Sequence, residues 1–395
     1  MGIRETKSAP TARATFPRIC MPTWRGFRRS AYRCGLYEAQ DVLAEIDDVD
    51  LIPLELSWGA WLDERWLRTP LYHDPTGRLI LANAGLKKVQ LRRDYDLFIA
   101  VCATLWDLPY INAIEGWRDR CRVGVCWIDE LWVSDLPNHK FWLSALRRFD
   151  YVFVGLRGTA PALSKAINRT CFWLPGGVDA LRFSPISGPA YRCIDVYSIG
   201  RRYDGIHQVM LKAAERGEIF YVHDTHVGGG LTEVYDHRQH REMLANMAKH
   251  SRYFVVSAAK MDQNDYKAQV EIGFRYFEGA AAGAIMIGDA PDCESYRALC
   301  GWPEAVIQIR PDGSDTMPVL KELSSDPERI SGISRRNTTE ALLRHDWAHR
   351  WDEMLRIIGL EASPRRIARE QRLNRLADIF TSADLEPRLA LRRPF

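Results

Sequence analysis

The chain has 395 residues, 46% hydrophobic and 27% charged, a composition typical of globular proteins that bury a sizeable core. At roughly 100 to 200 residues per domain, this length predicts two or three domains. The 54 basic and 51 acidic residues leave a formal net charge of +3, which is too balanced to indicate a nucleic-acid partner. No apolar run approaches the roughly 18 residues that a bilayer span needs, so we expect a cytoplasmic protein, with at most peripheral contact at the inner face of the membrane.

Residues 1–16 are basic and lack the apolar segment of a secretory signal, which predicts a flexible N-terminal arm. The nine cysteines form no Cys-x-x-Cys pair and no zinc spacing with histidine. We therefore expect reduced thiols, as in the cytoplasm, and no metal site.

Short β-branched and aromatic runs alternate with helical patterns along most of the chain, which is typical of βαβ units with mostly parallel sheets. A first series of predicted strands covers residues 18–21, 50–56, 96–102, 122–128, 150–156 and 171–175. A second series covers residues 194–200, 219–223, 252–258, 284–289 and 305–309.

The segment 184–192 contains Pro, Gly and Ser and separates the two series, which marks it as a linker. We expect an N-terminal Rossmann-like domain over 17–183 and a second over 193–345, followed by a closing helix and a basic tail over 346–395. Parallel sheets bind ligands at the carboxyl ends of their strands, so the site is expected in the cleft between the domains.

Three segments carry the functional interpretation. The first, residues 149–185, ends a strand with Pro175, Gly177, Val178 and Asp179, and then Phe183 and Pro185. The second, residues 194–214, runs from a strand into Gly200, Arg201 and Arg202 and then a helical pattern. The third, residues 269–289, contains Glu271, Gly273, Arg275 and Glu278 before a run of small residues and an apolar strand.

Together these segments resemble the GT-B glycosyltransferases, and within them the retaining group that includes the spore-maturation-type transferases. The resemblance covers roughly residues 95–357. It implies an α/β fold of two Rossmann-like doubly wound domains facing across a cleft, with a helical C-terminal extension. It also implies an acceptor-binding first domain and a second domain that binds a nucleotide sugar.

For the donor side, the resemblance implies that Gly200 with Arg201 or Arg202 neutralises the diphosphate, and that Glu278 holds the ribose hydroxyls. It places Glu271 near the sugar, although six residues separate the two glutamates here against seven in the family. Independently, a helix beginning near Gly273 would direct unpaired amides and the positive end of its dipole at a diphosphate, and Arg275 would add a cation. Without the resemblance, Glu278 would be interpreted as a solvated helix acid.

The loop of residues 222–230 lies near the nucleobase or sugar in the family, which makes His223 and His226 donor-binding candidates. On the acceptor side, Asp129 follows a predicted buried strand and could orient or deprotonate a hydroxyl, although such carboxylates are more often turn groups. Trp347 and Trp351 are four residues apart, which favours packing over a platform for sugars. His237 and His240 are expected at the surface.

The expected activity is transfer of a hexosyl group from a nucleoside diphosphate sugar to a hydroxyl of a glycan, lipid-linked or small-molecule acceptor, and the resemblance implies retention at the anomeric carbon. No cofactor is expected besides this co-substrate. Two alternatives stay open: a nucleotide-sugar epimerase of the same fold, and a non-catalytic transferase-like binding protein.

Overall fold

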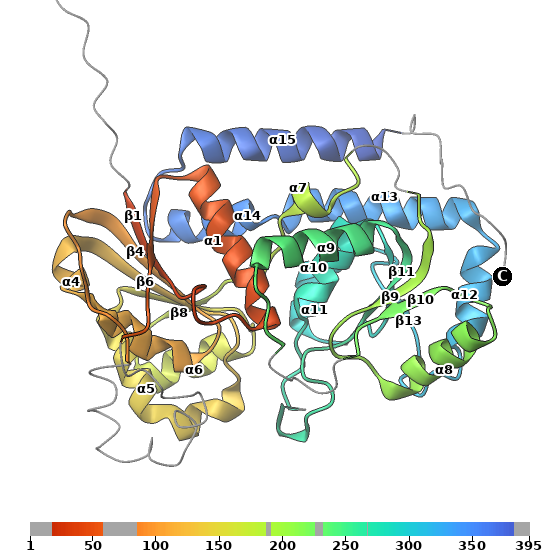
Figure 1. The fold of residues 1–395 in the computed structure, drawn as a ribbon, viewed down its shortest axis with the longest axis horizontal. Coiled ribbons are helices and arrows are strands. Elements are labelled where there is room, and N and C mark those ends of the chain that lie inside the picture. The colour runs from red at the N-terminus through yellow and green to blue at the C-terminus, as the bar shows by residue number, and fades with distance from the viewer. Residues whose placement is uncertain (1–17, 58–84, 187–190, 226–231, 267, 383–395) are drawn as a thin grey trace, which may run out of the picture.

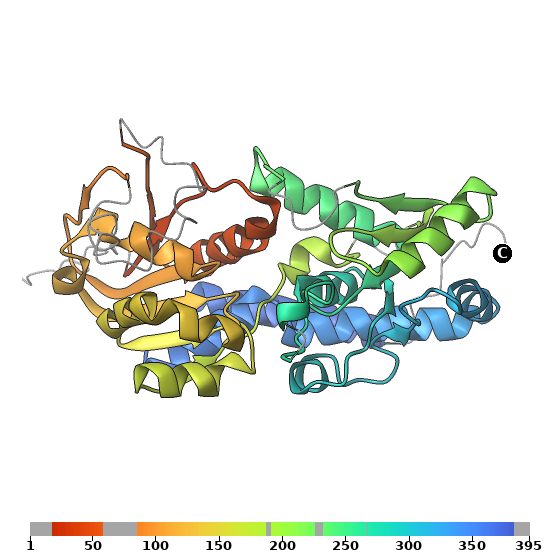
Figure 2. The same ribbon diagram turned by 90° about the horizontal axis from the view of Figure 1, so that it is seen from below.

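The computed structural model describes residues 18–57, 85–186, 191–225, 232–266 and 268–382 (Figure 1). The expected N-terminal arm, the centre of the expected linker and His226 lie outside the described residues. The described part forms two α/β units, each built around a parallel sheet, as predicted (Figures 1 and 2).

The first unit contains a six-stranded parallel sheet in the order β2-β1-β4-β6-β7-β8. Its central strands are almost wholly buried, which explains why they are continuous apolar runs rather than alternating ones. A short parallel pair, β3 and β5, lies outside this sheet and has no counterpart among the predicted strands. The strands of this unit are β1 (Ile19–Thr23), β2 (Val49–Pro53), β3 (Val89–Gln90), β4 (Tyr95–Cys102), β5 (Ile114–Glu115), β6 (Cys121–Ile128), β7 (Tyr151–Val154) and β8 (Cys171–Trp173).

Helices cover both faces of this sheet, as in a doubly wound fold. The α-helices of this unit are α1 (Cys34–Ile46), α4 (Trp117–Arg120), α5 (Lys140–Ala145) and α6 (Thr159–Ile167), whereas α7 (Ala180–Phe183) packs on α9, α10 and α13 of the second unit. The 3-10 helices are η1 (Ala31–Arg33), η3 (Leu105–Ala113), η4 (Val133–His139) and η5 (Leu146–Arg148).

The second unit contains a five-stranded parallel sheet in the order β10-β9-β11-β12-β13. Its strands are β9 (Ile194–Ser198), β10 (Tyr221–His223), β11 (Ser251–Val256), β12 (Ile285–Gly288) and β13 (Ile307–Gln308). Its helices are α8 (Asp204–Glu215), α9 (His237–Lys249), η6 (Asn264–Tyr266), α10 (Phe274–Ala281), α11 (Glu294–Leu299), α12 (Thr316–Ser324) and α13 (Pro327–Arg344).

Helix α14 (Trp347–Ile357) returns the chain to the first unit. Trp347 and Trp351 are 0% and 1% exposed, and both rings lie against Trp127 of β6 with centroids 5.8 and 5.9 Å away. The Trp351 indole also donates to the Ala39 carbonyl in α1 at 2.9 Å. The prediction that these two residues serve packing is therefore confirmed.

Helix α15 (Pro364–Thr381) replaces most of the basic tail that the sequence predicted. Ser363 caps its N-terminus, since the Ser363 hydroxyl accepts from the Arg366 amide at 3.2 Å. Figure 1 shows α15 lying across both units, against α13 at one end and α1 at the other. Arg369 is 5% exposed because it pairs with Asp346 and Asp179, which fixes this otherwise polar helix to the body.

None of the helices in the described ranges is long and apolar enough to cross a bilayer. All nine cysteines lie within those ranges as free thiols, and most are buried in the core.

Candidate functional site

The turn after β9 lies at the topological switch point of the second sheet, between β9 and β11, where such sheets bind ligands. Gly200 has a φ of +81°, a conformation that favours glycine, and its amide donates to the Asp224 carboxylate at 2.8 Å. From the neighbouring strand end, the Ser257 hydroxyl donates to the Arg201 carbonyl at 3.0 Å. The turn is therefore held from both neighbouring strands.

Both arginines of this turn are paired with carboxylates. Arg202 pairs with Asp224, which follows β10, and also donates to the Asp224 carbonyl at 2.7 Å. Arg201 pairs with Asp262 in the segment after β11. Asp224 organises the turn, and no spacing in the sequence indicated that role.

Helix α10 begins after Gly273, as the sequence predicted, and the space in front of this residue is open. Gly273 has an extended backbone, and a Cβ built on it would have no atom within 4 Å. The first amides of a helix have no partner within it, so they form a potential anion site here.

Phe274 anchors this helix start to the first unit. A Cβ built on Gly176 would lie 2.9 Å from the Phe274 ring, and one built on Gly177 would lie 2.9 Å from the His345 carbonyl oxygen. Neither glycine has a positive φ. Both glycines are therefore needed for close packing.

Glu278 is 0% exposed and lies between two guanidinium groups, those of Arg275 and of Arg241 in α9. Arg241 also donates two hydrogen bonds, of 2.8 and 2.9 Å, to the carboxylate of Glu38 in α1. Arg275, Glu278, Arg241 and Glu38 therefore form a continuous series of ion pairs. Burial alone would raise the pKa of Glu278, but Arg275 and Arg241 hold it below its ordinary value. The interpretation of Glu278 as a solvated helix acid is wrong. Its role as a ribose ligand stays a prediction.

Arg275 is the residue of this series of ion pairs that reaches solvent, with 31% of its side chain exposed. It lies over the β9 turn, since a Cβ built on Gly200 would be 3.7 Å from Arg275 Nε. The start of α10 and the Gly200 turn are therefore side by side, and a cation lies between them.

His237 and His240 lie at the junction of the units, and the expectation that they are surface residues is wrong. His237 Nε2 is 2.8 Å from the Asp41 carboxylate of α1. Burial lowers the pKa of His240 to about 4, and Arg275 and Arg241 contribute in the same direction, so His240 is neutral at pH 7.

Glu271 joins the second unit to the start of α6. Its carboxylate accepts from the Gly158 amide at 2.7 Å and from Gln269 Nε2 at 3.0 Å, and the residue is 3% exposed. Its expected contact with the donor sugar stays a prediction, and in the described structure its hydrogen bonds bridge the two units.

Asp129 lies at the carboxyl end of β6 and is half-buried. Within the described ranges its carboxyl group has no hydrogen-bond or ion-pair partner. Burial, followed by the charge of Glu130, raises the pKa of Asp129 to about 8. Glu130 pairs with Lys260 of the second unit at 2.8 Å, so this strand end faces the junction.

His223 ends β10, and its Nδ1 lies 2.9 Å from the Asp224 carbonyl oxygen. Its ring lies beside that of His207, with centroids 4.9 Å apart. No three His, Cys, Asp or Glu side chains of the described residues are grouped so that they could hold a metal ion.

Residues 201–356 match a protein family described as glycosyl transferase-like. An alpha-glucosyltransferase in complex with UDP and a 13-mer DNA containing an HMU base has a similar fold, with a TM-score of 0.52 and 14% identity over 87% of this chain and 100% of that one. An alpha-glucosyltransferase in complex with UDP-glucose and DNA containing an abasic site gives a TM-score of 0.51 at 14% identity, over 87% of this chain and 99% of that one.

No curated protein matches the chain by sequence. The matched segment begins at Arg201, in the turn after β9, and includes the start of α10 and nearly all of helix α14. Residues 201–356 thus match a glycosyl transferase-like family, and the chain has the fold of the GT-B glycosyltransferases, which confirms the resemblance found in the sequence.

Proposed function

We propose that the protein transfers a hexosyl group from a nucleoside diphosphate sugar to an acceptor hydroxyl, with retention at the anomeric carbon. The observation that carries this proposal is the open start of α10 beside Arg275 and the Gly200 turn. The family match covers this region, and the similar structures contain UDP or UDP-glucose, which supports a uridine diphosphate sugar as the first donor to test.

In this proposal the donor diphosphate lies at the first amides of α10, and Arg275 neutralises it. A guanidinium can bind two phosphate oxygens and stays charged at any working pH. The same groups would stabilise the departing diphosphate as its charge develops, which lowers the barrier to cleavage of the glycosidic bond. Arg201 and Arg202 contribute by fixing the turn through Asp262 and Asp224.

Glu278 has a positioning role toward Arg275 in the described state. If it also binds ribose, one guanidinium contact must be exchanged for sugar hydroxyls, and Arg275 is the partner free to move because it is the more exposed. Donor binding would then shift Arg275 from the carboxylate to the diphosphate. Each charge keeps a partner throughout that exchange.

Asp129 is proposed as the acceptor-side group. With a pKa of about 8, its carboxyl is largely protonated at pH 7 and ionises in the range where a general base is effective. Because it has no internal partner in the described part, it can bond to an acceptor hydroxyl without breaking an existing contact.

Isothermal titration with UDP, GDP and ADP sugars, combined with an assay of nucleotide release across acceptor alcohols, tests the proposal. Arg275→Gln should weaken binding of the preferred donor at least tenfold, on the order of 1.4 kcal/mol. The matched control is Arg297→Gln in α11, whose side chain is 59% exposed and pairs with the exposed Asp292. If no nucleotide sugar binds, the proposal is wrong. If epimerised donor forms without acceptor, the protein is an isomerase rather than a transferase.

Proton NMR of the product tests retention through the anomeric coupling constant. We also expect EDTA to leave the rate unchanged, because Arg275 and the amides of α10 supply the positive charge that a metal would otherwise provide. Loss of activity in EDTA that Mg²⁺ restores would contradict that expectation.

A further inference from the structure

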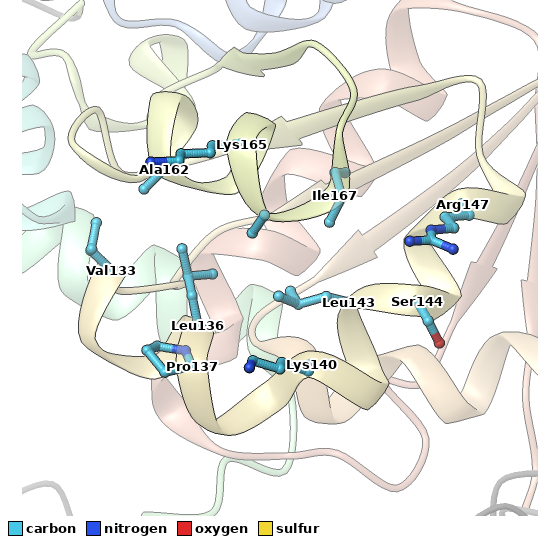
Figure 3. Close-up of a pocket in the computed structure, with 11 residues that line it drawn as sticks. Val133, Leu136, Pro137, Lys140, Leu143, Ser144, Arg147, Ala162, Lys165 and Ile167 are labelled. Carbon is cyan, nitrogen blue, oxygen red and sulfur yellow. The ribbon is translucent and has the colours of Figure 1, made fainter.

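A cavity of about 600 Å³ lies in the first unit, away from the start of α10, between the η4–α5 segment and α6 (Figure 3). Its walls are mainly apolar and include Leu136, Leu143 and Ile167. This volume falls in the range of pockets that hold a single small ligand.

Three cations surround these apolar walls: Lys140 of α5, Arg147 of η5 and Lys165 of α6 (Figure 3). No acidic side chain is among the lining residues, and none of the three cations forms an ion pair with the described residues. Long basic side chains can line an apolar surface with their methylene stems while the charged ends remain at the rim. The cavity therefore combines an apolar interior with three positive charges that no carboxylate of the described ranges neutralises.

One end of the cavity lies at the junction with the second unit. Val133, which lines it, donates its amide to Gln269 Oε1 of that unit at 2.9 Å. Val133 is four residues from Asp129, and four extended residues span at most ~14 Å. The cavity thus begins within that distance of the proposed acceptor-side carboxyl.

We propose that this cavity binds one single-chain amphiphile, with its apolar chain between α5 and α6 and an anionic head group at Lys140, Arg147 and Lys165. Apolar walls account for the chain, and the three cations without acidic partners account for the charge of the head. A neutral amphiphile would leave these charges unmatched, and an inorganic anion would leave the apolar walls unused. The binding does not depend on the proposed transferase activity.

Isothermal titration with decyl phosphate, below its micelle concentration, tests the proposal on the full chain without donor. One molecule should bind per chain, and decyl maltoside and inorganic phosphate should each bind at least tenfold more weakly. Equal binding of decyl phosphate and decyl maltoside would overturn the assignment of an anionic head.

Two variants locate the binding. Ala166→Phe places a ring into the cavity from an exposed position of α6 and should weaken decyl phosphate binding at least tenfold. The pair Lys140→Glu with Lys165→Glu should do the same, while Lys321→Glu, an exposed position of α12, should leave it unchanged. Circular dichroism checks folding, and Lys165→Gln substitutes if the double variant does not fold. Unaltered binding in the folded variants would overturn the proposal.

Discussion

Arg241 links the two units through buried carboxylates, and its replacement by methionine tests the contribution of this link. The guanidinium is 3% exposed and pairs with two carboxylates, Glu38 and Glu278, that are each 1% exposed at the side chain. Methionine has a similar length but no charge. After the change Glu278 retains Arg275, and Glu38 retains Arg182 at 3.5 Å together with the Asp179 amide and the Trp347 indole as donors.

Removing one partner of a buried ion pair typically costs about 3–5 kcal/mol because a buried charge is left uncompensated. Because each carboxylate keeps one arginine, we expect Arg241→Met to lower the free energy of unfolding by about 3 kcal/mol at pH 7, the lower end of that range, as measured by urea denaturation. The control is Arg238→Met in the same helix, since Arg238 is 65% exposed and its pair with Asp41 is expected to contribute at most about 1 kcal/mol.

The pH dependence gives a second, independent test. The pKa of Glu278 is lowered in the folded state, so its contribution to stability is present at neutral pH and is lost as the pH falls through that lowered value. Without Arg241 the pKa of Glu278 is lowered less, so this contribution shrinks. The deficit of Arg241→Met should therefore be constant between pH 7 and about 4.5, the ordinary pKa of a glutamate, and should decrease as the pH falls below that value. A loss below about 1 kcal/mol at pH 7, or one that does not change with pH, would refute the reasoning.

Three further predictions concern single positions. Because the pKa of Asp129 is raised to about 8, its contribution to stability should fall with rising pH between about 4 and 8, by at most ~1.4 kcal/mol per pH unit. Asp129→Asn should remove this contribution, measured as the difference between the wild-type and variant slopes in urea titrations. The same variant should lose the rise in transfer rate near pH 8. Gly273→Ala should unfold like the wild type yet weaken donor binding, whereas Gly177→Ala should cost about 1–3 kcal/mol because its Cβ meets the His345 carbonyl. Trp351→Ala should cost about 3–5 kcal/mol by thermal or urea unfolding, since its side chain fills the core under α14. Equal stability of the two alanine variants at the glycines would contradict the packing account.

The sheet strands were predictable because each is a continuous apolar run bounded by polar or turn-forming residues. The predicted run 122–128, for example, is β6 (Cys121–Ile128), and 194–200 contains β9 (Ile194–Ser198). The pair of β3 and β5 was missed because two residues are too few to show a period. Helix α15 was missed because its helical pattern is weak: its apolar face is short, with Leu373 and Ala377 buried in the core, and the buried pair of Arg369 with Asp346 adds to this packing.

Some residues of the candidate site were likewise predictable from the sequence, and others were not. Gly273 and the helix after it were predictable from local chemistry, and so was the place of Asp129 after a buried strand. The burial of Glu278 was not, because its partner Arg241 lies 37 residues away and the next carboxylate, Glu38, lies 203 residues from Arg241. Contacts at such separations depend on how the two units pack, which no local spacing encodes.

The connection from Arg275 to Glu38 makes the donor side a product of both units. Arg275 is oriented by Glu278, Glu278 is shared with Arg241, and Arg241 is fixed by Glu38 on α1 of the first unit. A change in the relative position of the units would disturb the pair of Glu38 and Arg241 first. Loss of the Glu38 contact would leave Arg241 with Glu278 as its remaining carboxylate, which weakens the hold of Glu278 on Arg275 and makes Arg275 more available to a diphosphate. Packing of the units and affinity for the donor should therefore change together.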